Sequence, residues 1–145
     1  MRLVDEVVRI RSTWPERLGE SGEVRVVVVD DQETFRDAMG SLVAATPGFK
    51  LAGEAPSGED GIAAVDRLSP ELVLMDIRMP GMSGIDAART LAEIHPEVVV
   101  ILTSVYGPEE LPPDLVDGCG AAAFARKQTL RPRLLRELWD RHRHG

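Results

Sequence analysis

The chain has 145 residues and a formal net charge of −7, with 43% hydrophobic and 28% charged residues. This length favours one compact domain with a short appendage, and the composition is typical of a soluble globular protein. The apolar runs are too short for a membrane span, and the acidic balance argues against direct binding of nucleic acid.

Residues 1–23 are expected to be an N-terminal extension that precedes a single domain over residues 24–143. Apolar residues recur in the extension at helical spacing, at Leu3, Val7 and Ile10. Because isolated helices this short are marginal in water, the extension is expected to be either a short docked helix or a disordered leader. Its apolar residues do not form an uninterrupted signal-peptide core, so the expected location is cytoplasmic.

From residue 24 onward, short runs of β-branched residues alternate with segments of helical periodicity. This alternation is typical of βαβ units around a parallel sheet. Strands are expected over residues 24–29, 49–54, 71–76, 98–103 and 121–125. The pattern therefore predicts an α/β fold with five parallel strands.

Helices are expected in the segments between these strands and at the end of the chain. Apolar residues keep helical spacing over residues 35–43, 62–68 and 85–91, and a last helix is expected over residues 130–141. Ser57 and Ser83 stand where side chains could cap the second and third helices. Three prolines limit residues 107–120 to a short, displaced fourth helix, so about five helices are expected.

Chemically distinctive side chains stand where the expected strands end. Asp30 and Asp31 follow the first strand, Asp76 ends the third, Thr103 ends the fourth and Lys127 follows the fifth. Ligands of open parallel sheets bind at this edge, because the loops there gather side chains from several βα units. Converging carboxylates repel one another unless a hard cation such as Mg²⁺ shares them. The added ammonium and hydroxyl groups favour an anionic ligand, for which phosphate is the natural candidate.

Four motifs occur in an order that resembles the receiver domains of two-component response regulators. They read VDD over residues 29–31, LMDIRMPGMSG over 74–84, TS over 103–104 and FARK over 124–127. The resemblance covers residue 24 to the last helix. It implies a flavodoxin-like, doubly wound sheet of five strands with about five helices, in a stand-alone regulator of the chemotaxis type.

The resemblance also implies a role for each matching residue. Asp76 would be the nucleophile that becomes phosphorylated in a Mg²⁺-dependent reaction, with Lys127 and Thr103 contacting the phosphoryl group. Phe124 would act with Thr103 as the conformational switch of a phosphorelay. The metal ligands implied by the resemblance are Asp30, Asp31, Asp76 and the backbone carbonyl of Arg78.

The implied partners are a sensor histidine kinase or phosphotransfer protein and an unidentified downstream protein, without direct contact to nucleic acid or membrane. A homodimer through the face formed by helix four, strand five and helix five is a further expectation. No enzymatic activity is expected beyond self-phosphorylation and self-dephosphorylation. Two alternatives are a receiver-like interaction module that works without phosphorylation and a Mg²⁺-dependent phosphatase with an aspartyl nucleophile.

Overall fold

The computed structural model describes the backbone of residues 3–4, 7–9, 22–107 and 118–144, and the side chains of residues 22–107 and 118–140. Five parallel strands form the main sheet: β3 (Val24–Val29), β4 (Phe49–Ala55), β5 (Leu72–Asp76), β6 (Val99–Ser104) and β7 (Ala123–Arg126). The helices of this described part are α1 (Glu33–Ala44), α2 (Gly58–Leu68), α3 (Gly84–Ile94) and α5 (Pro132–His144).

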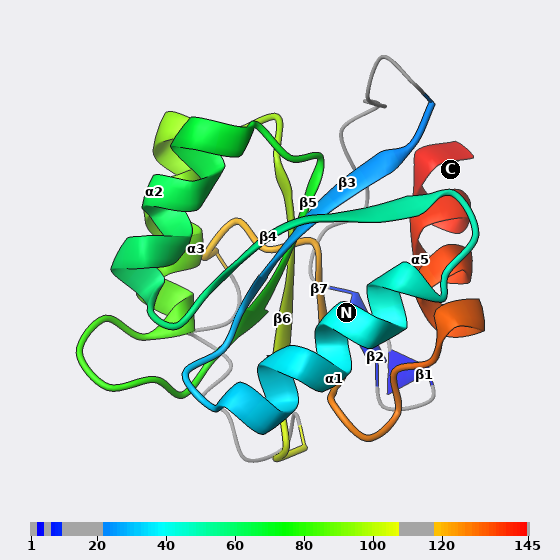
Figure 1. The fold of residues 1–145 in the computed structure, drawn as a ribbon, viewed down its shortest axis with the longest axis horizontal. Coiled ribbons are helices and arrows are strands. Elements are labelled where there is room, and N and C mark those ends of the chain that lie inside the picture. Colours follow the sequence, from blue (N-terminus) through cyan, green and yellow to red (C-terminus); the bar gives the residue numbers. More distant parts are fainter. Residues whose placement is uncertain (1–2, 5–6, 10–21, 108–117, 145) are drawn as a thin grey trace.

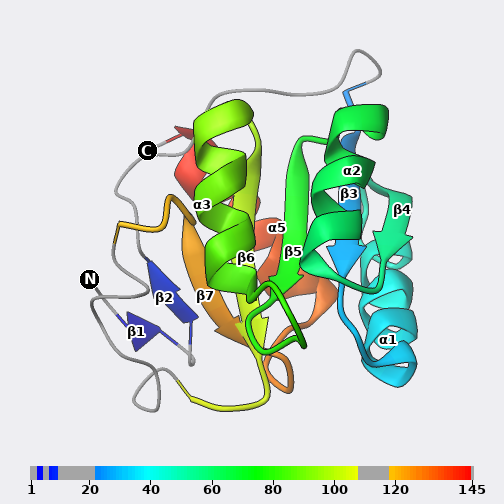
Figure 2. The ribbon, with the colours of Figure 1, turned by 90° about the vertical axis from the view of Figure 1, so that its left-hand side faces the viewer.

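The parallel strands are arranged in the order β4-β3-β5-β6-β7, which confirms the predicted doubly wound, flavodoxin-like α/β fold. Helices cover both faces of the sheet, with α2 and α3 on one side and α1 and α5 on the other (Figures 1 and 2). β3, the first of the parallel strands in the chain, therefore lies inside the sheet, between β4 and β5. This position explains why Val24–Val29 is almost continuously apolar, since both of its faces are covered.

Alternate residues of the strands build two separate hydrophobic cores. In β3, Val27 and Val29 pack toward α2 and α3, whereas Val26 and Val28 pack toward α1 and α5. This division follows from the two-residue period of side chains along a strand. Among the residues on the α5 side, Phe49 and Trp139 meet edge to face, with their ring centroids 6.3 Å apart.

The predicted serine caps of α2 and α3 are confirmed. The Ser57 hydroxyl accepts a hydrogen bond from the Asp60 N–H, and the Ser83 hydroxyl accepts one from the Asp86 N–H, each at 3.1 Å. Such caps satisfy backbone donors that have no partner within the helix. They fix the points at which the two helices begin, immediately after the loops at the carboxyl edge of the sheet.

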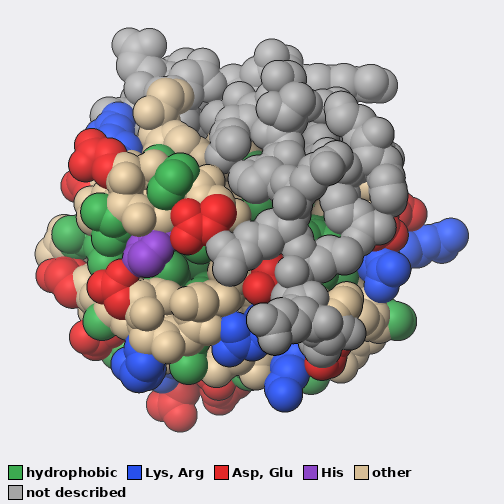
Figure 3. Space-filling model, turned by 90° about the horizontal axis from the view of Figure 1, so that it is seen from above, with side chains coloured by type: hydrophobic (Ala, Val, Ile, Leu, Met, Phe, Trp, Pro, Cys, Tyr) green, Lys and Arg blue, Asp and Glu red, His purple; other side chains and the backbone are tan. Residues whose placement is uncertain are grey.

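The C-terminal end of α3 is linked to α2 through His95. Its Nε2 lies 2.5 Å from Asp66 Oδ1 of α2, and its Nδ1 lies 3.4 Å from Glu97 Oε1. Both carboxylates raise the pKa of the His95 imidazole above its usual value of 6.5, and the Asp66 hydrogen bond is the largest cause. Figure 3 shows a histidine with acidic side chains on either side on the face seen from above.

The N-terminal residues correct one prediction. Leu3–Val4 (β1) and Val7–Arg9 (β2) are strands, so neither of the two expectations for the extension, a short docked helix or a disordered leader, describes these residues. β2 pairs antiparallel with β7, and β1 pairs antiparallel with β2. The physical reason is that β7 ends the parallel sheet with an unpaired edge, whose backbone groups offer hydrogen bonds that an isolated helix would not gain.

The division of the chain at residue 23 stays a prediction, and most of the segment expected to hold the fourth helix, residues 108–117, lies outside the described residues. None of the helices in the described part of the chain combines the length and the apolar character needed to cross a bilayer.

Candidate functional site

Three carboxylates meet at the carboxyl edge of the sheet, beyond β3 and β5. Asp30 and Asp31 directly follow β3, and Asp76 is the last residue of the neighbouring strand β5. One oxygen from each of the three side chains lies within 4.8 Å of the others. Asp30 and Asp76 are buried, whereas Asp31 is accessible to solvent. The cluster is therefore closed on the side of Asp30 and Asp76, and a ligand can approach it from the side of Asp31.

Lys127 reaches the same cluster from the end of β7. Its Nζ lies 2.6 Å from Asp30 Oδ2 and 3.2 Å from Asp76 Oδ1, and all three side chains are almost fully buried. The ammonium also lies 4.2 Å from the ring centroid of Phe35 in α1. A buried ammonium is costly unless charges compensate it, and the two carboxylates supply that compensation. Lys127 thus ties the end of β7 to the ends of β3 and β5.

Burial is the main influence on the titration of Asp76. It raises the pKa of the Asp76 carboxyl from 3.8 to about 6, and nearby Asp30 and Asp31 add to the increase. Lys127 opposes it through its charge and its hydrogen bond. The ionised carboxylate is therefore held in an unfavourable environment, which a bound cation would relieve.

The Asp30 carboxylate and backbone are fixed by the beginning of α1. The Gln32 N–H donates to Asp30 Oδ1 at 3.0 Å, and Arg36 Nη1 donates to the Asp30 carbonyl oxygen at 2.8 Å. Arg36 also faces Glu54 of β4, with a nitrogen-to-oxygen distance of 3.8 Å. These contacts orient Asp30 in the site before any ligand binds.

The two residues expected to act as the switch lie in the strands beside the cluster. Thr103 of β6 is the register partner of Asp76 and is 2% exposed. Phe124 of β7 is 1% exposed and belongs to the core on the α2 and α3 side. The structure thus places Thr103 next to the site, whereas Phe124 lies one strand further away, opposite Leu102 of β6.

Arg78 lies in the loop after β5, and its side chain turns to an aromatic ring. Its guanidinium carbon is 4.5 Å from the ring centroid of Tyr106, which follows β6 and is 44% exposed. This stacking joins the two loops at the mouth of the cluster. The expected role of the Arg78 backbone carbonyl as a metal ligand stays a prediction.

Gly84 allows the loop after β5 to pack closely on the strand end. A Cβ atom at this position would lie 1.9 Å from the Asp76 carbonyl oxygen and 2.8 Å from its carbonyl carbon. The Gly84 N–H donates to the Ile77 carbonyl at 2.9 Å. Only glycine fits this approach, so Gly84 helps to set where the Asp76 backbone lies.

The donor set fits a hard divalent cation. Three carboxylate groups within reach of one another supply the oxygen ligands that Mg²⁺ prefers, and the partly open side leaves room for water ligands. Among the described residues, this is the one cluster of acidic, histidine or cysteine side chains with such spacing. The arrangement is typical of an anion site that also holds a metal.

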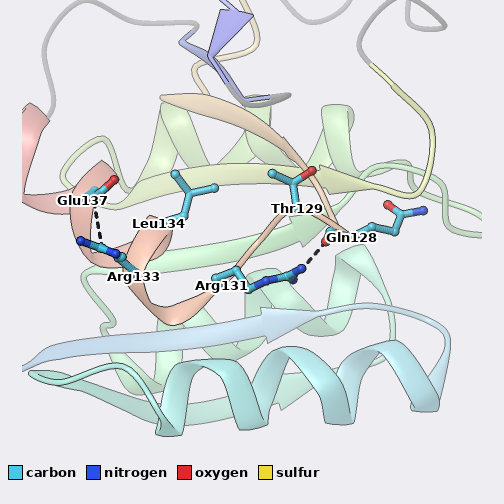
Figure 4. Close-up of a pocket in the computed structure, with 6 residues that line it drawn as sticks. All are labelled: Gln128, Thr129, Arg131, Arg133, Leu134 and Glu137. Carbon is cyan, nitrogen blue, oxygen red and sulfur yellow. Dashed lines mark hydrogen bonds and ion pairs between the residues drawn. The ribbon is translucent and has the colours of Figure 1, made fainter.

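A second hollow in the surface, at the beginning of α5, has a different character. Figure 4 shows its lining, which comes from the connection after β7 and from the first turns of the helix. Arg131 Nη1 donates to the Gln128 carbonyl at 3.2 Å, and Arg133 lies 3.6 Å from Glu137. Its arginines are thus engaged locally, and the hollow contains none of the three aspartates.

Sequence reasoning missed three contributors to the site, namely Phe35, Gln32 and Arg36. Phe35 was considered only as one of the apolar residues at helical spacing over residues 35–43, but its ring faces the Lys127 ammonium. The sequence did contain one indication that this side chain lies near the site, because the residue stands at the start of the helix that follows the aspartate pair. The contacts of Gln32 and Arg36 with Asp30 depend on the geometry of the turn into α1, which the sequence pattern does not specify.

Comparison with known proteins gives a consistent family assignment. Residues 26–138 match the model of the response regulator receiver domain. The response regulator GacA of Pseudomonas viridiflava is 36% identical over 104 residues, which are 72% of this chain and 48% of that protein. A protein-glutamate methylesterase/protein-glutamine glutaminase of Geobacter metallireducens is 40% identical over 88 residues, 61% of this chain and 25% of that protein. The chain therefore spans about half the length of GacA and about a quarter of the length of the methylesterase.

Solved structures show the same fold. The signal receiver domain of the response regulator NarL from Mycobacterium tuberculosis superposes with a TM-score of 0.73 at 27% identity, covering 85% of this chain and 98% of that one. A chain of the CheX-CheY-BeF3-Mg complex from Borrelia burgdorferi gives a TM-score of 0.72 at 26% identity, covering 83% and 91%. That protein was thus solved in a complex that contains a partner, beryllofluoride and magnesium.

Proposed function

This chain belongs to the response regulator receiver domain family, and we propose from that premise that it is a phosphorylation-activated signalling switch with Asp76 as the phosphoryl acceptor. The observation that carries the proposal is the contact of Lys127 Nζ with both Asp30 and Asp76 at the edge where the three aspartates meet. A nucleophile, a cation for the phosphoryl oxygens and a metal-binding donor set thus occupy one small volume.

In the proposed reaction, an Asp76 carboxylate oxygen attacks the phosphorus of a phosphodonor. The bond to phosphorus forms as the bond between phosphorus and the donor's leaving atom breaks, and the electron pair of that bond stays with the leaving group. This transfer needs positioning and charge stabilisation, and no separate general base is required because the nucleophile is already ionised. The Lys127 ammonium would stabilise the phosphoryl oxygens, a role that its ion pair with Asp76 supports.

Asp30, Asp31 and Asp76 would hold Mg²⁺, with the Arg78 carbonyl as a further ligand. When bound, Mg²⁺ supplies positive charge that offsets the carboxylates and the phosphoryl oxygens. Asp76 must remain ionised to act as a nucleophile, and its pKa of about 6 leaves it largely ionised at neutral pH. Thr103 would donate a hydrogen bond to the new phosphoryl group, a role that its register position beside Asp76 in the next strand supports.

The conformational step would follow from these contacts. Thr103 moves toward the phosphoryl group, Phe124 fills the space that Thr103 leaves, and β7 with the adjoining face changes shape. A shift from 1:99 to 99:1 between the two states requires about 5.5 kcal/mol of differential interaction, which is within reach of charged hydrogen bonds and metal ligation together.

A sensor histidine kinase or phosphotransfer protein would supply the phosphoryl group in the cytoplasm, and a separate protein would bind the altered face. We also propose a homodimer through the face of helix four, β7 and α5, although residues 108–117, where helix four is expected, lie outside the described residues.

The decisive test is incubation with Mg²⁺ and a small phosphodonor such as acetyl phosphate, followed by intact-mass measurement. The expected result is the addition of one phosphoryl group to the wild type and none to Asp76→Asn. An unchanged wild-type mass at saturating donor would overturn the proposal.

The two lysines of the chain provide a matched comparison for the role of Lys127. Lys127→Met should slow phosphorylation on the order of 100-fold, as the loss of a transition-state donor typically does. Lys50→Met should behave like the wild type, because Lys50 is exposed on β4, away from the aspartates. Equal rates for the two variants would show that Lys127 has no special role.

The phosphorylation-independent alternative makes a separate claim about the partner. It requires that a downstream partner, once identified, binds wild type, phosphorylated wild type and Asp76→Asn with the same affinity. The proposed switch requires tighter binding of one phosphorylation state, measured by titration of the partner against each form.

A further inference from the structure

We propose that β1 and β2 form an N-terminal cap that holds the backbone of Phe124 in the resting position and is released when Asp76 is phosphorylated. The cap consists of Leu3–Val4 and Val7–Arg9. It would make the free edge of β7 available only in the activated state. The coupling to phosphorylation rests on the proposed function, whereas the cap itself rests on the pairing of the strands.

The register places the cap directly on the proposed switch residue. β2 pairs with β7 through three residue pairs, and Val8 lies opposite Phe124 in the central one. Figure 2 shows β2 beside β7, with β1 as the outermost strand. Without β2, β7 would be the last strand of the sheet on this side, because its other neighbour is β6.

The backbone of Phe124 is the part of β7 that faces the cap. The Lys127 N–H donates to the Ser104 carbonyl of β6 at 2.8 Å. Since successive residues of a strand turn their amide groups to opposite neighbours, Ala123 and Ala125 also face β6, and Phe124 faces β2. The opposed residues Val8 and Phe124 are therefore the pair that exchanges two hydrogen bonds.

The other neighbour of β6 supports the same assignment. The Thr103 carbonyl accepts from the Ile77 N–H at 3.0 Å, so Thr103 turns its amide groups to the β5 side. Leu102 and Ser104 consequently turn theirs to β7. Among the described residues, the cap is the segment that lies opposite the backbone groups of Phe124. Without it, these groups would need another extended chain or water.

The same strand is tied to the phosphorylation site. Lys127 follows β7 immediately, and its ammonium is paired with Asp30 and Asp76. A phosphoryl group on Asp76 would compete for this ammonium and draw the end of β7 toward the site. Phe124, three residues earlier, is buried beside β6 and is expected to move with Thr103.

Because the cap pairs with Phe124 in its resting position, it stabilises that conformation relative to any conformation in which Phe124 has moved. Because coupling is reciprocal, the modification that favours the second state must weaken the cap to the same extent. Among the described residues, the cap makes three residue pairs with β7. We expect a small displacement of this strand to release so short a pairing. Release would expose the Phe124 N–H and C=O groups, which suit the antiparallel addition of an extended segment from a partner.

The experiment is hydrogen exchange of single backbone amides, measured by NMR in the full chain and in a chain lacking residues 1–9. The Phe124 amide should be protected in the full chain and should exchange roughly tenfold faster or more in the shortened chain. The Ala123 and Ala125 amides should keep their protection in both chains, because they face β6. If the Phe124 amide exchanges equally fast in the two chains, the cap is overturned.

A pair of full-length variants separates the backbone contact from the loss of residues. Val8→Pro removes the N–H that faces Phe124, whereas Val8→Ala keeps it. Faster exchange of Phe124 in Val8→Pro with unchanged exchange in Val8→Ala supports the cap. The same exchange rate in both variants would contradict it.

Phosphorylation is then tested on the full chain with Mg²⁺ and acetyl phosphate, and intact mass reports the modification independently. Faster exchange of Phe124 in the phosphorylated chain supports the coupling. Unchanged exchange in a chain whose mass shows the added group overturns the coupling and leaves the proposed function standing. If no group is added, the proposed function and the coupling both fail, while the comparison with the shortened chain still decides whether the cap exists.

Discussion

Folding places the Asp76 carboxyl in an environment that disfavours its ionised form. This carboxyl is buried beside Asp30 and Asp31, and its pKa of about 6 is well above the ordinary value of 3.8. A carboxyl whose pKa is raised by folding binds protons more tightly in the folded state, so it favours folding most below about pH 4. This contribution is lost as the pH rises from about 4 to about 6. At neutral pH, the ionised group therefore destabilises the fold.

Replacing this carboxylate should make the chain more stable at neutral pH. Asp76→Asn is expected to raise the free energy of unfolding at pH 7 by about 1–2 kcal/mol, after solvent screening is taken into account. The difference between variant and wild type should shrink as the pH falls from about 6 toward 4, because Asp76 then becomes protonated in the folded state. Urea unfolding at the two pH values measures it. An Asn variant that is less stable than the wild type at both pH values would contradict the burial argument.

The positions of the charged residues could be predicted from the sequence, but their pairing could not. Asp31, Asp76 and Lys127 stand at the ends of apolar runs, and parallel strands bring such ends to one edge. The additional contact of Lys127 with Asp30 and its position over the Phe35 ring depend on side-chain geometry. No spacing rule encodes these two contacts.

Among the structural elements, α2 and α3 begin in the same way and differ in one steric contact. Each starts with glycine after a serine cap, at Gly58 and Gly84. A Cβ on Gly58 would meet only the flexible Met82 side chain, at 3.2 Å, whereas one on Gly84 would overlap the Asp76 carbonyl. The two helices thus begin in the same way, but the steric requirement for glycine is much stricter at Gly84 than at Gly58.

Alanine at these two glycines should have unequal effects. Gly84→Ala is expected to lower the free energy of unfolding by about 3 kcal/mol, at the upper end of the usual cost of overpacking, and to slow phosphorylation because Asp76 is displaced. Gly58→Ala should change stability by less than about 1 kcal/mol. Chemical denaturation and the rate of reaction with acetyl phosphate measure both effects. Equal destabilisation by the two substitutions would show that the contact with the Asp76 backbone is unimportant.

The stabilisation that the His95 contacts between α2 and α3 provide should depend on pH. The pKa of His95 is raised by Asp66 and Glu97, so protonated His95 stabilises the fold below its unfolded pKa of about 6.5. This stabilisation is lost as the pH rises through the higher pKa of the folded state. His95→Gln should therefore lower the melting temperature at pH 6 more than at pH 9.

Asp66→Asn is the matched test of the same link, because it removes the main partner of His95. It should show a smaller loss of melting temperature at pH 9 than at pH 6, in the same direction as His95→Gln. A constant difference across this range in both variants would exclude a charged His95 contact.

The N-terminal strands illustrate what a sequence cannot show at the level of elements. Apolar residues at positions 3, 7 and 10 have helical spacing, yet Leu3–Val4 and Val7–Arg9 are strands. The deciding factor is the unpaired edge of β7, which exists only after the five-stranded sheet has formed. Local periodicity contains no information about this edge.

For the whole molecule, the alternation of strands and helices was sufficient to predict the α/β class with five parallel strands, and the resemblance to receiver domains supplied the doubly wound, flavodoxin-like arrangement. Each predicted strand overlaps an observed one, because a strand buried on both faces gives an apolar run that differs clearly from helical periodicity. The site then follows from topology, since it lies where β3 and β5 end side by side. The N-terminal cap and the bridge at His95 depend on contacts between distant segments and could not be predicted from local patterns.

Binding of Mg²⁺ should stabilise the whole chain, since the acidic cluster exists only in the folded state. At ten times its dissociation constant, Mg²⁺ should raise the free energy of unfolding by about 1.4 kcal/mol. NaCl at the same ionic strength should not reproduce this gain. Asp31→Asn should reduce it, since Asp31 is the accessible carboxylate of the cluster and takes no part in the ion pairs of Lys127. An equal gain with NaCl would exclude a specific metal site.

The central claim is that the phosphoryl group is carried by Asp76 rather than by another of the clustered aspartates. Borohydride reduction of the phosphorylated chain converts an aspartyl phosphate to homoserine, and peptide mass spectrometry then locates the converted residue. Conversion at Asp76 alone, dependent on Mg²⁺, is the expected result. Conversion at Asp30 or Asp31, or none in a chain exposed to saturating acetyl phosphate, would contradict the claim.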